Sequence, residues 1–327
     1  MSSAPPDLSR KAEAPMPRVG VIYNPRSHRN KGQDLASDPA PHVYVAQPGA
    51  RDQLPDALRE LSEWGMDLLA INGGDGTVRD VLSAGHKVFN DNWPAIAVLP
   101  KGKTNALTVD LGGPQGWSLQ GAIDAFRIGR RIRRRPLMIY PKGAPDKAML
   151  GFILGAGAYT LGIRAGQDAH RMGAFNSLAV AVTTVWGVLS AFIGSRSNPW
   201  RRGVQMELLL GENRAPLVHS GKGDAARRQL LLASTLQRFP AGIKPFGSLQ
   251  EGLKLAVMDP VDRRTSALIP AVVMGWQPKD MAQRGFHQLS ASRFELTLDD
   301  EFILDGEAYP AGSYIVEPGP DIEFVAP

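Results

Sequence analysis

The sequence predicts a two-domain fold, in which an α/β domain with a parallel sheet precedes a mostly antiparallel β domain. A chain of 327 residues is long for one ordinary core. Apolar runs alternate with helical patterns in the first third of the chain, which is typical of a parallel sheet covered by helices. After an arginine-rich stretch near Arg135, short strands follow one another directly. We therefore predict an α/β domain over residues 17–135 and a β-rich domain over residues 136–304.

The elements of the first domain can be predicted in order. Leu54, Leu58 and Leu61 recur at helical spacing, and Gly65 ends that helix. A second helix begins after the glycine-rich turn that follows the third strand. Four short apolar runs bounded by turn residues are the predicted strands, at residues 18–24, 42–46, 67–71 and 94–100.

The second domain is predicted from strands separated by glycine, proline and charged turns. These strands lie at residues 136–141, 147–159, 204–211, 227–235, 253–259, 293–300 and 301–306. A long apolar run at 175–194 interrupts them. Three interpretations of this run stay open: a buried helix, a helix beside a lipid site, or a membrane span weakened by its Asn, Ser and Thr residues.

Composition excludes several classes of protein. Hydrophobic residues make up 43% of the chain and charged residues 21%, as in globular proteins. The absence of cysteine excludes disulfides, thiolate metal sites and thiol nucleophiles, and fits a cytoplasmic protein. Residues 1–16 are proline-rich without an apolar segment, so we expect a disordered leader and no secretory signal.

The charge balance is close to even, but two arginine clusters stand out. Six arginines lie between Arg127 and Arg135, and Arg196, Arg201 and Arg202 surround Trp200. Such clusters attract anionic lipid, although a solvated linker or loop explains each of them equally well. Nucleic acid is not an expected partner, because aromatic residues are not interleaved with the arginines.

The most specific motif is the turn Gly73-Gly74-Asp75-Gly76-Thr77, between a predicted strand and a helix. Glycines let backbone N–H groups approach phosphate oxygens, and a helix N-terminus favours negative charge. Asp75 would repel phosphate unless it holds Mg²⁺ or a nucleotide hydroxyl, which indicates a metal-nucleotide site. A tight turn with a helix cap is the structural alternative.

Two further polar loops follow strand ends on the same predicted edge of the sheet. The first strand leads into Asn24, Arg26 and Ser27, and the fourth leads into the loop from Lys101 to Asn105. Ligands of open α/β sheets bind beyond the carboxyl ends of the strands, so the three loops predict one site.

The motifs "YNPRS", "NGGDGT", "LPKGKTN" and "LDGE" occur in an order that resembles the diacylglycerol kinase catalytic family, which includes bacterial lipid kinases and sphingosine kinases. The resemblance implies an N-terminal nucleotide domain of the NAD kinase and diacylglycerol kinase type, a C-terminal β-sandwich that holds the lipid, and a return of the chain to the first domain over residues 305–327. It also implies ATP and Mg²⁺ as cofactors, a lipid substrate, and peripheral association with an anionic membrane. The oligomeric state, a homodimer included, stays open.

The resemblance assigns roles to individual residues. Asp75 and Glu307 would bind the metal, and Asp75 together with Glu251 would be catalytic. The residues assigned to the nucleotide are Asn24, Arg26, Ser27, Gly73, Gly74, Asp75, Gly76, Thr77, Gly102, Lys103, Thr104, Asn105, Asp305, Gly306 and Glu307.

The chain departs from the family pattern at three positions. Glu251-Gly252 stands where the family has the Asp-Gly of the catalytic base, Lys103 replaces a threonine, and His28 replaces a glycine. Glutamate retains the chemistry of a general base. Besides an active lipid kinase, the departures leave two alternatives: a binding protein with reduced or lost activity, and an NAD kinase, which shares the glycine-rich turn.

Overall fold

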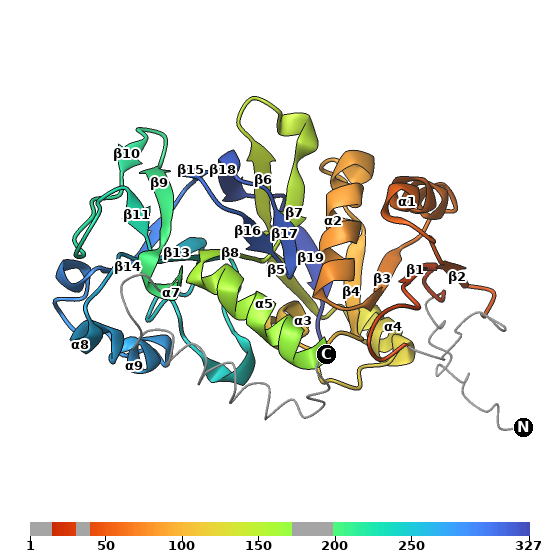
Figure 1. Ribbon diagram of the computed structural model, residues 1–327. Coiled ribbons are helices and arrows are strands. Elements are labelled where there is room, and N and C mark those ends of the chain that lie inside the picture. The colour runs from red at the N-terminus through yellow and green to blue at the C-terminus, as the bar shows by residue number, and fades with distance from the viewer. Residues whose placement is uncertain (1–14, 31–39, 172–198) are drawn as a thin grey trace, which may run out of the picture.

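The computed structural model describes residues 15–30, 40–171 and 199–327, which form one mostly parallel sheet and two antiparallel sheets (Figure 1). The predicted leader, up to residue 14, and the apolar run at 175–194 lie outside the described residues. Among the residues that are described, no helix has both the length and the apolar character needed to cross a membrane.

The first sheet has the strand order β2-β1-β3-β4-β19-β5. Its first four strands are parallel and coincide with the four predicted ones. Their bounds are β1 Val19–Tyr23, β2 Val43–Ala46, β3 Leu68–Gly73 and β4 Ala95–Pro100. β19 (Ile322–Val325) pairs parallel to β4, and β5 (Arg131–Arg134) pairs antiparallel to β19 at the edge.

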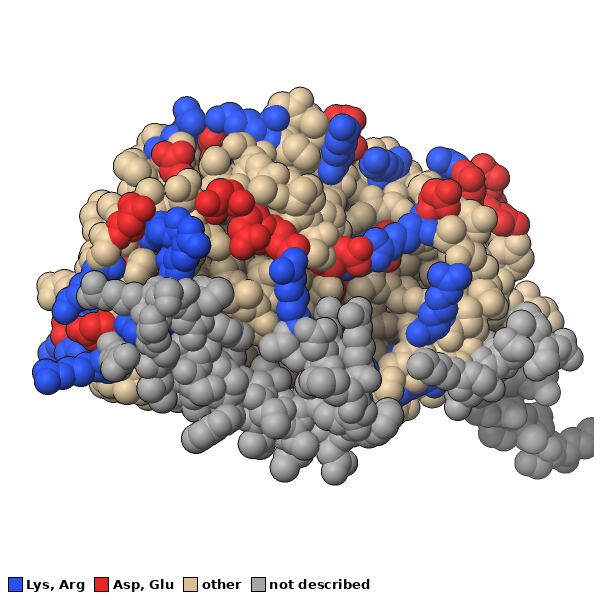
Figure 2. Space-filling model, viewed as in Figure 1, with Lys and Arg blue, Asp and Glu red and all other residues tan. Residues whose placement is uncertain are grey.

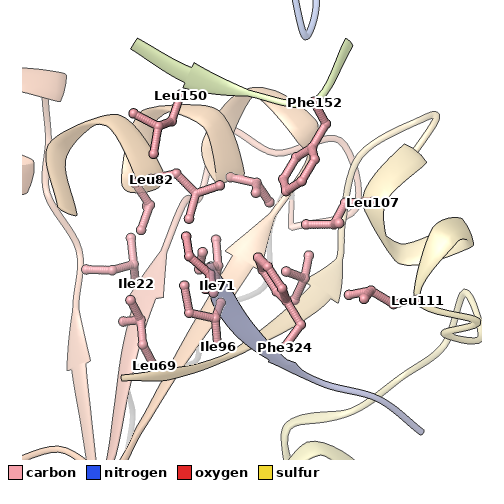
Figure 3. Close-up of a cluster of buried hydrophobic side chains, with 14 of the residues drawn as sticks. Ile22, Leu69, Ile71, Leu82, Ile96, Leu107, Leu111, Leu150, Phe152 and Phe324 are labelled. Carbon is pink, nitrogen blue, oxygen red and sulfur yellow. The ribbon is translucent and has the colours of Figure 1, made fainter. Parts of the chain in front are cut away.

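Helices cover both faces of this sheet. α1 (Leu54–Glu63) buries the three leucines that predicted it, and together with α2 (Asp75–Phe89) it packs over one face. α4 (Leu119–Arg127) packs over the other face. Figure 3 shows the core on the α2 side, where Phe152 of the second domain meets Phe324 of β19 with ring centroids 6.2 Å apart. The two domains therefore share part of one hydrophobic core.

The arginine-rich segment is a strand and not a linker. Arg134 pairs with the buried carboxylate of Asp110 (2.6 Å), and Arg133 pairs with Asp321 and Glu323. The guanidinium of Arg131 lies 4.2 Å from the ring centroid of Phe126. These arginines are held at the edge of the first sheet because acidic and aromatic partners from other elements face them.

The second domain is a sandwich of two antiparallel sheets, so the predicted fold class is confirmed. One sheet has the order β10-β9-β15-β18-β6-β7, with β11 on β9, and the other has the order β14-β13-β12-β8-β16-β17. Alternate side chains of both sheets fill the space between them. The first sandwich sheet comprises β6 Leu137–Pro141, β7 Met149–Gly151, β9 Val204–Leu210, β10 Ala215–Pro216, β11 Arg227–Arg228, β15 Phe294–Leu298 and β18 Gly312–Pro318. The second sandwich sheet comprises β8 Ile153–Gly157, β12 Leu230–Ser234, β13 Leu253–Met258, β14 Phe286–Ala291, β16 Phe302–Leu304 and β17 Glu307–Tyr309.

The chain returns to the first sheet only through β19. The return was predicted over residues 305–327, but β17 and β18 of this segment pair within the two sheets of the sandwich. The turn at Asp305 and Gly306 joins β16 to β17, beside α2 of the first domain.

Helices also cover the outer face of the second sandwich sheet. α5 (Ala158–Arg171), α8 (Arg263–Ser266) and α9 (Ile269–Val273) follow strand ends on this side, and α7 (Pro199–Arg202) precedes β9. Between α5, α9 and strands β12 to β14 lies a cavity of about 350 Å³ with almost entirely apolar walls. Leu232, Ala256 and Ile269 are among its lining residues.

Candidate active site

Three loops meet at the carboxyl edge of the first sheet, as the sequence predicts. Asn24 Nδ2 after β1 donates to Thr77 Oγ1 after β3 (2.8 Å). The backbone N–H of Lys101 after β4 donates to the carbonyl of Gly73, and Arg29 N donates to the carbonyl of Lys101, both at 3.0 Å. The loops are therefore bonded to one another and do not merely end at the same edge.

Glycine is required where two of the loops touch. A Cβ built on Gly74 would lie 2.8 Å from Cα of Gly102, and a Cβ on Gly102 would lie 2.7 Å from Cα of Gly74. A Cβ on Gly73 would lie 2.4 Å from Cβ of Thr77. The sequence repeats glycine here because backbones and a side chain occupy the space that a larger residue would need.

Replacing Gly102 by alanine should therefore push the third and fourth strand loops apart. We expect a loss of about 1–3 kcal/mol in the free energy of unfolding, as for other overpacked sites, and a clear loss of nucleotide affinity. Urea unfolding and nucleotide titration measure the two effects. Gly116, where a Cβ would meet nothing within 4 Å, provides the control, and equal stability of G102A and G116A would contradict the prediction.

Asn105 shapes its own loop and presents no free amide to the site. Its φ is 51°, and its side chain accepts from Gly102 N (2.8 Å) and donates to Gly102 O (2.9 Å). Of the other residues predicted for the nucleotide, Ser27 is buried, whereas Lys103 and Thr104 are exposed on the same loop as Asn105. Asn105 therefore acts through the geometry of the loop.

Asp75 lies at the junction of α2 and α3 (Ala106–Asp110). Its carboxylate accepts hydrogen bonds from the backbone at Asn105, Ala106 and Leu107, at the start of α3. Burial nevertheless raises the pKa of Asp75, and the backbone donors oppose this shift. The carboxylate is thus fixed in place by a neighbouring loop.

Asp305 lies beside Asp75, brought there by the turn after β16. Its two carboxylate oxygens accept from the backbone N–H groups of Phe152 (2.8 Å) and Ile153 (2.9 Å). A Cβ on Gly151 would lie 2.6 Å from Asp305 Oδ2, so glycine makes room for the carboxylate. Burial, and then the charge of Asp75, raise the pKa of Asp305 to about 7. Asp305 also has a left-handed backbone conformation (φ 44°).

Tyr159 of α5 joins this pair of carboxylates to the apolar cavity. Its ring fills the space above Gly155, where a Cβ would lie 2.0 Å from the ring. Burial, and then the charges of Asp305 and Asp75, raise the pKa of its hydroxyl. The same residue lines the apolar cavity. The sequence reading missed Tyr159, although the glycine four residues before it marks the close contact.

Glu307, predicted as a metal ligand, is engaged in ion pairs. Arg51 donates to both of its oxygens (3.1 and 2.9 Å), and this bond lowers the pKa of Glu307. The buried Arg79 lies 3.6 Å from Glu307 and donates to Asp80 (2.6 Å) and to the carbonyl of Leu304 (3.2 Å). This network ties α2 to the Asp305 turn.

A pocket of about 390 Å³ opens beyond the ends of β1 and β2. Asn24, Arg26 and Thr77, three of the residues predicted for the nucleotide, line it. Arg51 and Asp80 line it as well, and the sequence reading did not find them. The loop after β2 ends at the same sheet edge as the other three, which is the signal that could have indicated Arg51.

The loop of Glu251 lies at the Asp305 end of the second sandwich sheet. In the register of the sheet, Lys254 of β13 lies opposite Ser234 of β12, and Ser234 lies opposite Ile153 of β8. The backbone N–H of Ile153 is one of the two that donate to Asp305. Two strand spacings, about 10 Å, therefore separate Lys254 from Ile153. Glu251 is exposed on this loop, and Gly252 is in a left-handed conformation (φ 74°).

Lys254 holds the Glu251 loop from beneath. Its buried ammonium donates to the carbonyls of Gln250 (3.1 Å) and Gly252 (3.3 Å), which flank Glu251. Burial lowers the pKa of Lys254 to about 8, while the charges of Asp110 and Glu251 oppose the shift. A buried cation therefore fixes the backbone on both sides of the predicted base.

The donor set at Asp75 and Asp305 fits a hydrated cation. Burial raises the pKa of both carboxylates, and the charge of Asp75 adds to the shift of Asp305, so a positive charge between them is favoured. Both already accept backbone N–H groups, so they offer few free lone pairs, and Mg²⁺ in proteins keeps several waters with one or two carboxylates. Within the described residues, no cluster of three or more His, Asp or Glu forms a preorganised metal cage.

Comparison with known proteins finds a family model that matches part of the chain and solved structures that share its fold. Residues 18–137 match the family model of the diacylglycerol kinase catalytic domain. No curated protein sequence matches the chain significantly. A diacylglycerol kinase from Bacillus anthracis str. Sterne has a similar solved structure, with TM-score 0.59 and 14% identity over 95% of this chain and 97% of that one.

A putative diacylglycerol kinase from the same organism is similar too, with TM-score 0.62 and 13% identity over the same shares of both chains. At such identity these structures show that the two-domain fold is shared. The family match covers the loops after β1, β3 and β4, including the glycine-rich turn, but not the Asp305 turn, Tyr159 or the Glu251 loop. The chain is therefore similar to the diacylglycerol kinase catalytic domain over residues 18–137, and it shares its fold with solved structures that carry the diacylglycerol kinase name.

Proposed function

We propose that the protein transfers the terminal phosphoryl group of ATP to the hydroxyl of a lipid, with Mg²⁺ as the metal. The observation that carries this proposal is the position of Tyr159. Its ring packs against Gly155 and lines the apolar cavity, and burial followed by the charges of Asp305 and Asp75 raises the pKa of its hydroxyl. A site for anionic phosphates and a site for hydrocarbon thus adjoin one another.

The nucleotide is assigned to the pocket beyond β1 and β2. Asn24 and Thr77 provide polar groups in its lining, and Arg26 and Arg51 provide positive charge. The first N–H groups of a helix have no partner within that helix and attract anions. α2 begins at Asp75, so the phosphates would lie along the glycine-rich turn at its N-terminus.

Magnesium would be held by Asp75 and Asp305, with Glu307 remaining bound to Arg51 and Arg79. Bound there, Mg²⁺ would supply positive charge to the oxygens of the transferred phosphoryl group. The negative charges of Asp75 and Asp305 would hold the metal ion in position and balance its positive charge. In this proposal Asp305 takes the metal role that the sequence resemblance gives to Glu307.

The lipid is assigned to the apolar cavity, with its hydroxyl toward Tyr159. Walls of leucine, alanine, isoleucine and methionine favour a hydrocarbon chain over a polar acceptor. A diacylglycerol-like or sphingoid-like alcohol fits this chemistry. Glu251 would accept the hydroxyl proton as the phosphoryl group arrives, because its loop faces the same end of the sheet as Asp305. A lipid substrate also implies association with a membrane surface.

The direct test incubates the protein with labelled ATP, Mg²⁺ and a total lipid extract, and identifies labelled products by mass. We expect a labelled lipid phosphate with the wild type and a drop of about 10²- to 10⁴-fold in Glu251→Gln. Glu212→Gln, an exposed glutamate of the second domain, is the control and should retain activity.

Other outcomes of this test separate the alternatives. Equal background rates in wild type and E251Q would indicate a protein that binds nucleotide or lipid without transfer. Labelled NAD phosphate, formed when NAD replaces the lipid, would indicate an NAD kinase. Either result contradicts the proposed function.

A further inference from the structure

The segment that carries α8 and α9 is apolar on both of its sides. Its inner side packs on the sandwich, where Ile269 and Val272 line the apolar cavity and Val272 joins a buried cluster with Val261 and Phe286. Burial of this side is ordinary for a surface helix. The outer side departs from that pattern.

The outer side exposes four apolar residues, one in the turn between α8 and α9, two on α9 and one in the turn after α9. Ala267, Pro270, Ala271 and Met274 are all exposed, at positions i, i+3, i+4 and i+7. Met274 is 60% exposed, and Trp276 in the next turn is 46% exposed. The sequence has no charged residue between Arg264 and Lys279. A surface helix normally presents polar residues to water, so this face indicates a partner that is itself apolar.

The exposed tryptophan is held on a fixed turn. Gly275 adopts φ 99°, its N–H donates to Val272 O, and the N–H of Trp276 donates to Ala271 O, both at 2.9 Å. This pattern is the Schellman motif, which ends a helix rigidly. Lys244 N also donates to the carbonyl of Val273 (2.8 Å). Presenting Trp276 to solvent therefore requires no rearrangement.

Positive charge surrounds the N-terminal end of the same segment. A pocket of about 670 Å³ beside α8 is lined by five basic and two acidic residues, an excess of three positive charges. Lys222 pairs with Asp262 (2.9 Å), one of the two acidic residues. Lys and Arg side chains gather at the lower left of Figure 2, over the place of α8 in Figure 1. The basic residues of this pocket are Arg201, Arg202, Lys222, Arg227 and Arg264.

We propose that the α8–α9 face, residues 264–279 with the basic pocket beside it, docks the protein on an anionic lipid bilayer. Trp276 and Met274 would enter the interfacial layer, where tryptophan is enriched in membrane-bound proteins. The basic pocket would face lipid phosphates at the same depth. α9 also walls the apolar cavity, so the docked helix lies between the bilayer and the cavity to which the proposed function assigns the lipid. This face is separate from the strand β5, which lies at the edge of the first sheet.

Binding to sucrose-loaded vesicles tests the proposal without ATP or turnover, so its outcome is independent of the kinase assay. The vesicles contain phosphatidylcholine alone or with about a third phosphatidylglycerol, enough to give an anionic surface. We expect sedimentation with the anionic vesicles, weakened by salt. Quenching of fluorescence by brominated phosphatidylcholine should fall in Trp276→Phe.

Matched variants locate the contact. Met274→Asp combined with Trp276→Asp should lower vesicle binding at least about tenfold. Ile128→Asp should not, although Ile128 is 68% exposed, because it lies at the end of α4 in the first domain. Arg264→Glu should weaken binding about fivefold or more, as about 1 kcal/mol per cation implies, whereas Arg59→Glu on α1 should not.

Three results would overturn the proposal: no binding to anionic vesicles, equal binding by M274D/W276D and wild type, or a dimer of the wild type that M274D/W276D dissociates while vesicle binding is unchanged. The last would assign the face to a second copy of the chain. Thermal melting of each variant confirms that it is folded.

Discussion

Replacing Asp75 by asparagine should reduce lipid phosphorylation by about 10³-fold while the protein remains folded. Asparagine has the same shape and can still accept a hydrogen bond from the start of α3, but it lacks the negative charge that would hold the metal beside Asp305. The initial rate with labelled ATP and the lipid acceptor measures this loss.

The fold itself should tolerate Asp75→Asn, because the change removes a buried charge and its repulsion with Asp305. The melting temperature is therefore expected to stay equal or rise. Asp91→Asn, which changes an exposed aspartate, serves as the control for both measurements. Activity of D75N within threefold of wild type would refute the assignment of Asp75.

The second large effect is expected on stability, from Arg79→Met. Arg79 is 2% exposed and connects Asp80 to the carbonyl of Leu304. Methionine has a similar volume but cannot donate hydrogen bonds. The carbonyls of Leu304 and Asp305 and the carboxylate of Asp80 would lose the donor that Arg79 provides. We expect a loss of about 3 kcal/mol in the free energy of unfolding, measured in urea, as for other buried ion pairs broken on one side.

An exposed arginine separates this effect from a general loss of charge. Arg59→Met on α1 removes a surface ion pair with Asp56 and should change stability by less than about 1 kcal/mol. If R79M were as stable as R59M, the network would not hold the Asp305 turn. Lower activity of R79M at temperatures where it is folded would show that the turn has moved.

The sequence was sufficient for the parts of the site that depend on local chemistry. Gly73, Gly74 and Asp75 follow a buried strand and open a helix, and this order alone predicts a turn at the carboxyl edge of the sheet. Convergence of three loops also follows from the parallel arrangement. The sequence shows that residues 74 and 102 are both glycine, but their contact with each other arises only when the two loops pack together.

The remaining features depend on contacts between distant parts of the chain. Asp305 meets Asp75 only because the second domain packs on α2, and no periodicity encodes that contact. Arg51 belongs to no recognisable motif, and only the position of its loop at the shared sheet edge could have indicated it. For the arginines of β5 the sequence left two interpretations open, attraction of anionic lipid and a solvated linker, and a strand was not among them. Their partners, such as Asp110 and Glu323, come from distant parts of the chain.

The position of β19 has a consequence for how the protein is made. This strand is inserted between β4 and β5 and does not add to an outer edge. Until residues 322–325 leave the ribosome, β4 has an unpaired side and β5 has no partner, so the nascent first domain exposes strand edges throughout synthesis of the second. The first sheet can therefore be completed only after synthesis of the second domain has ended.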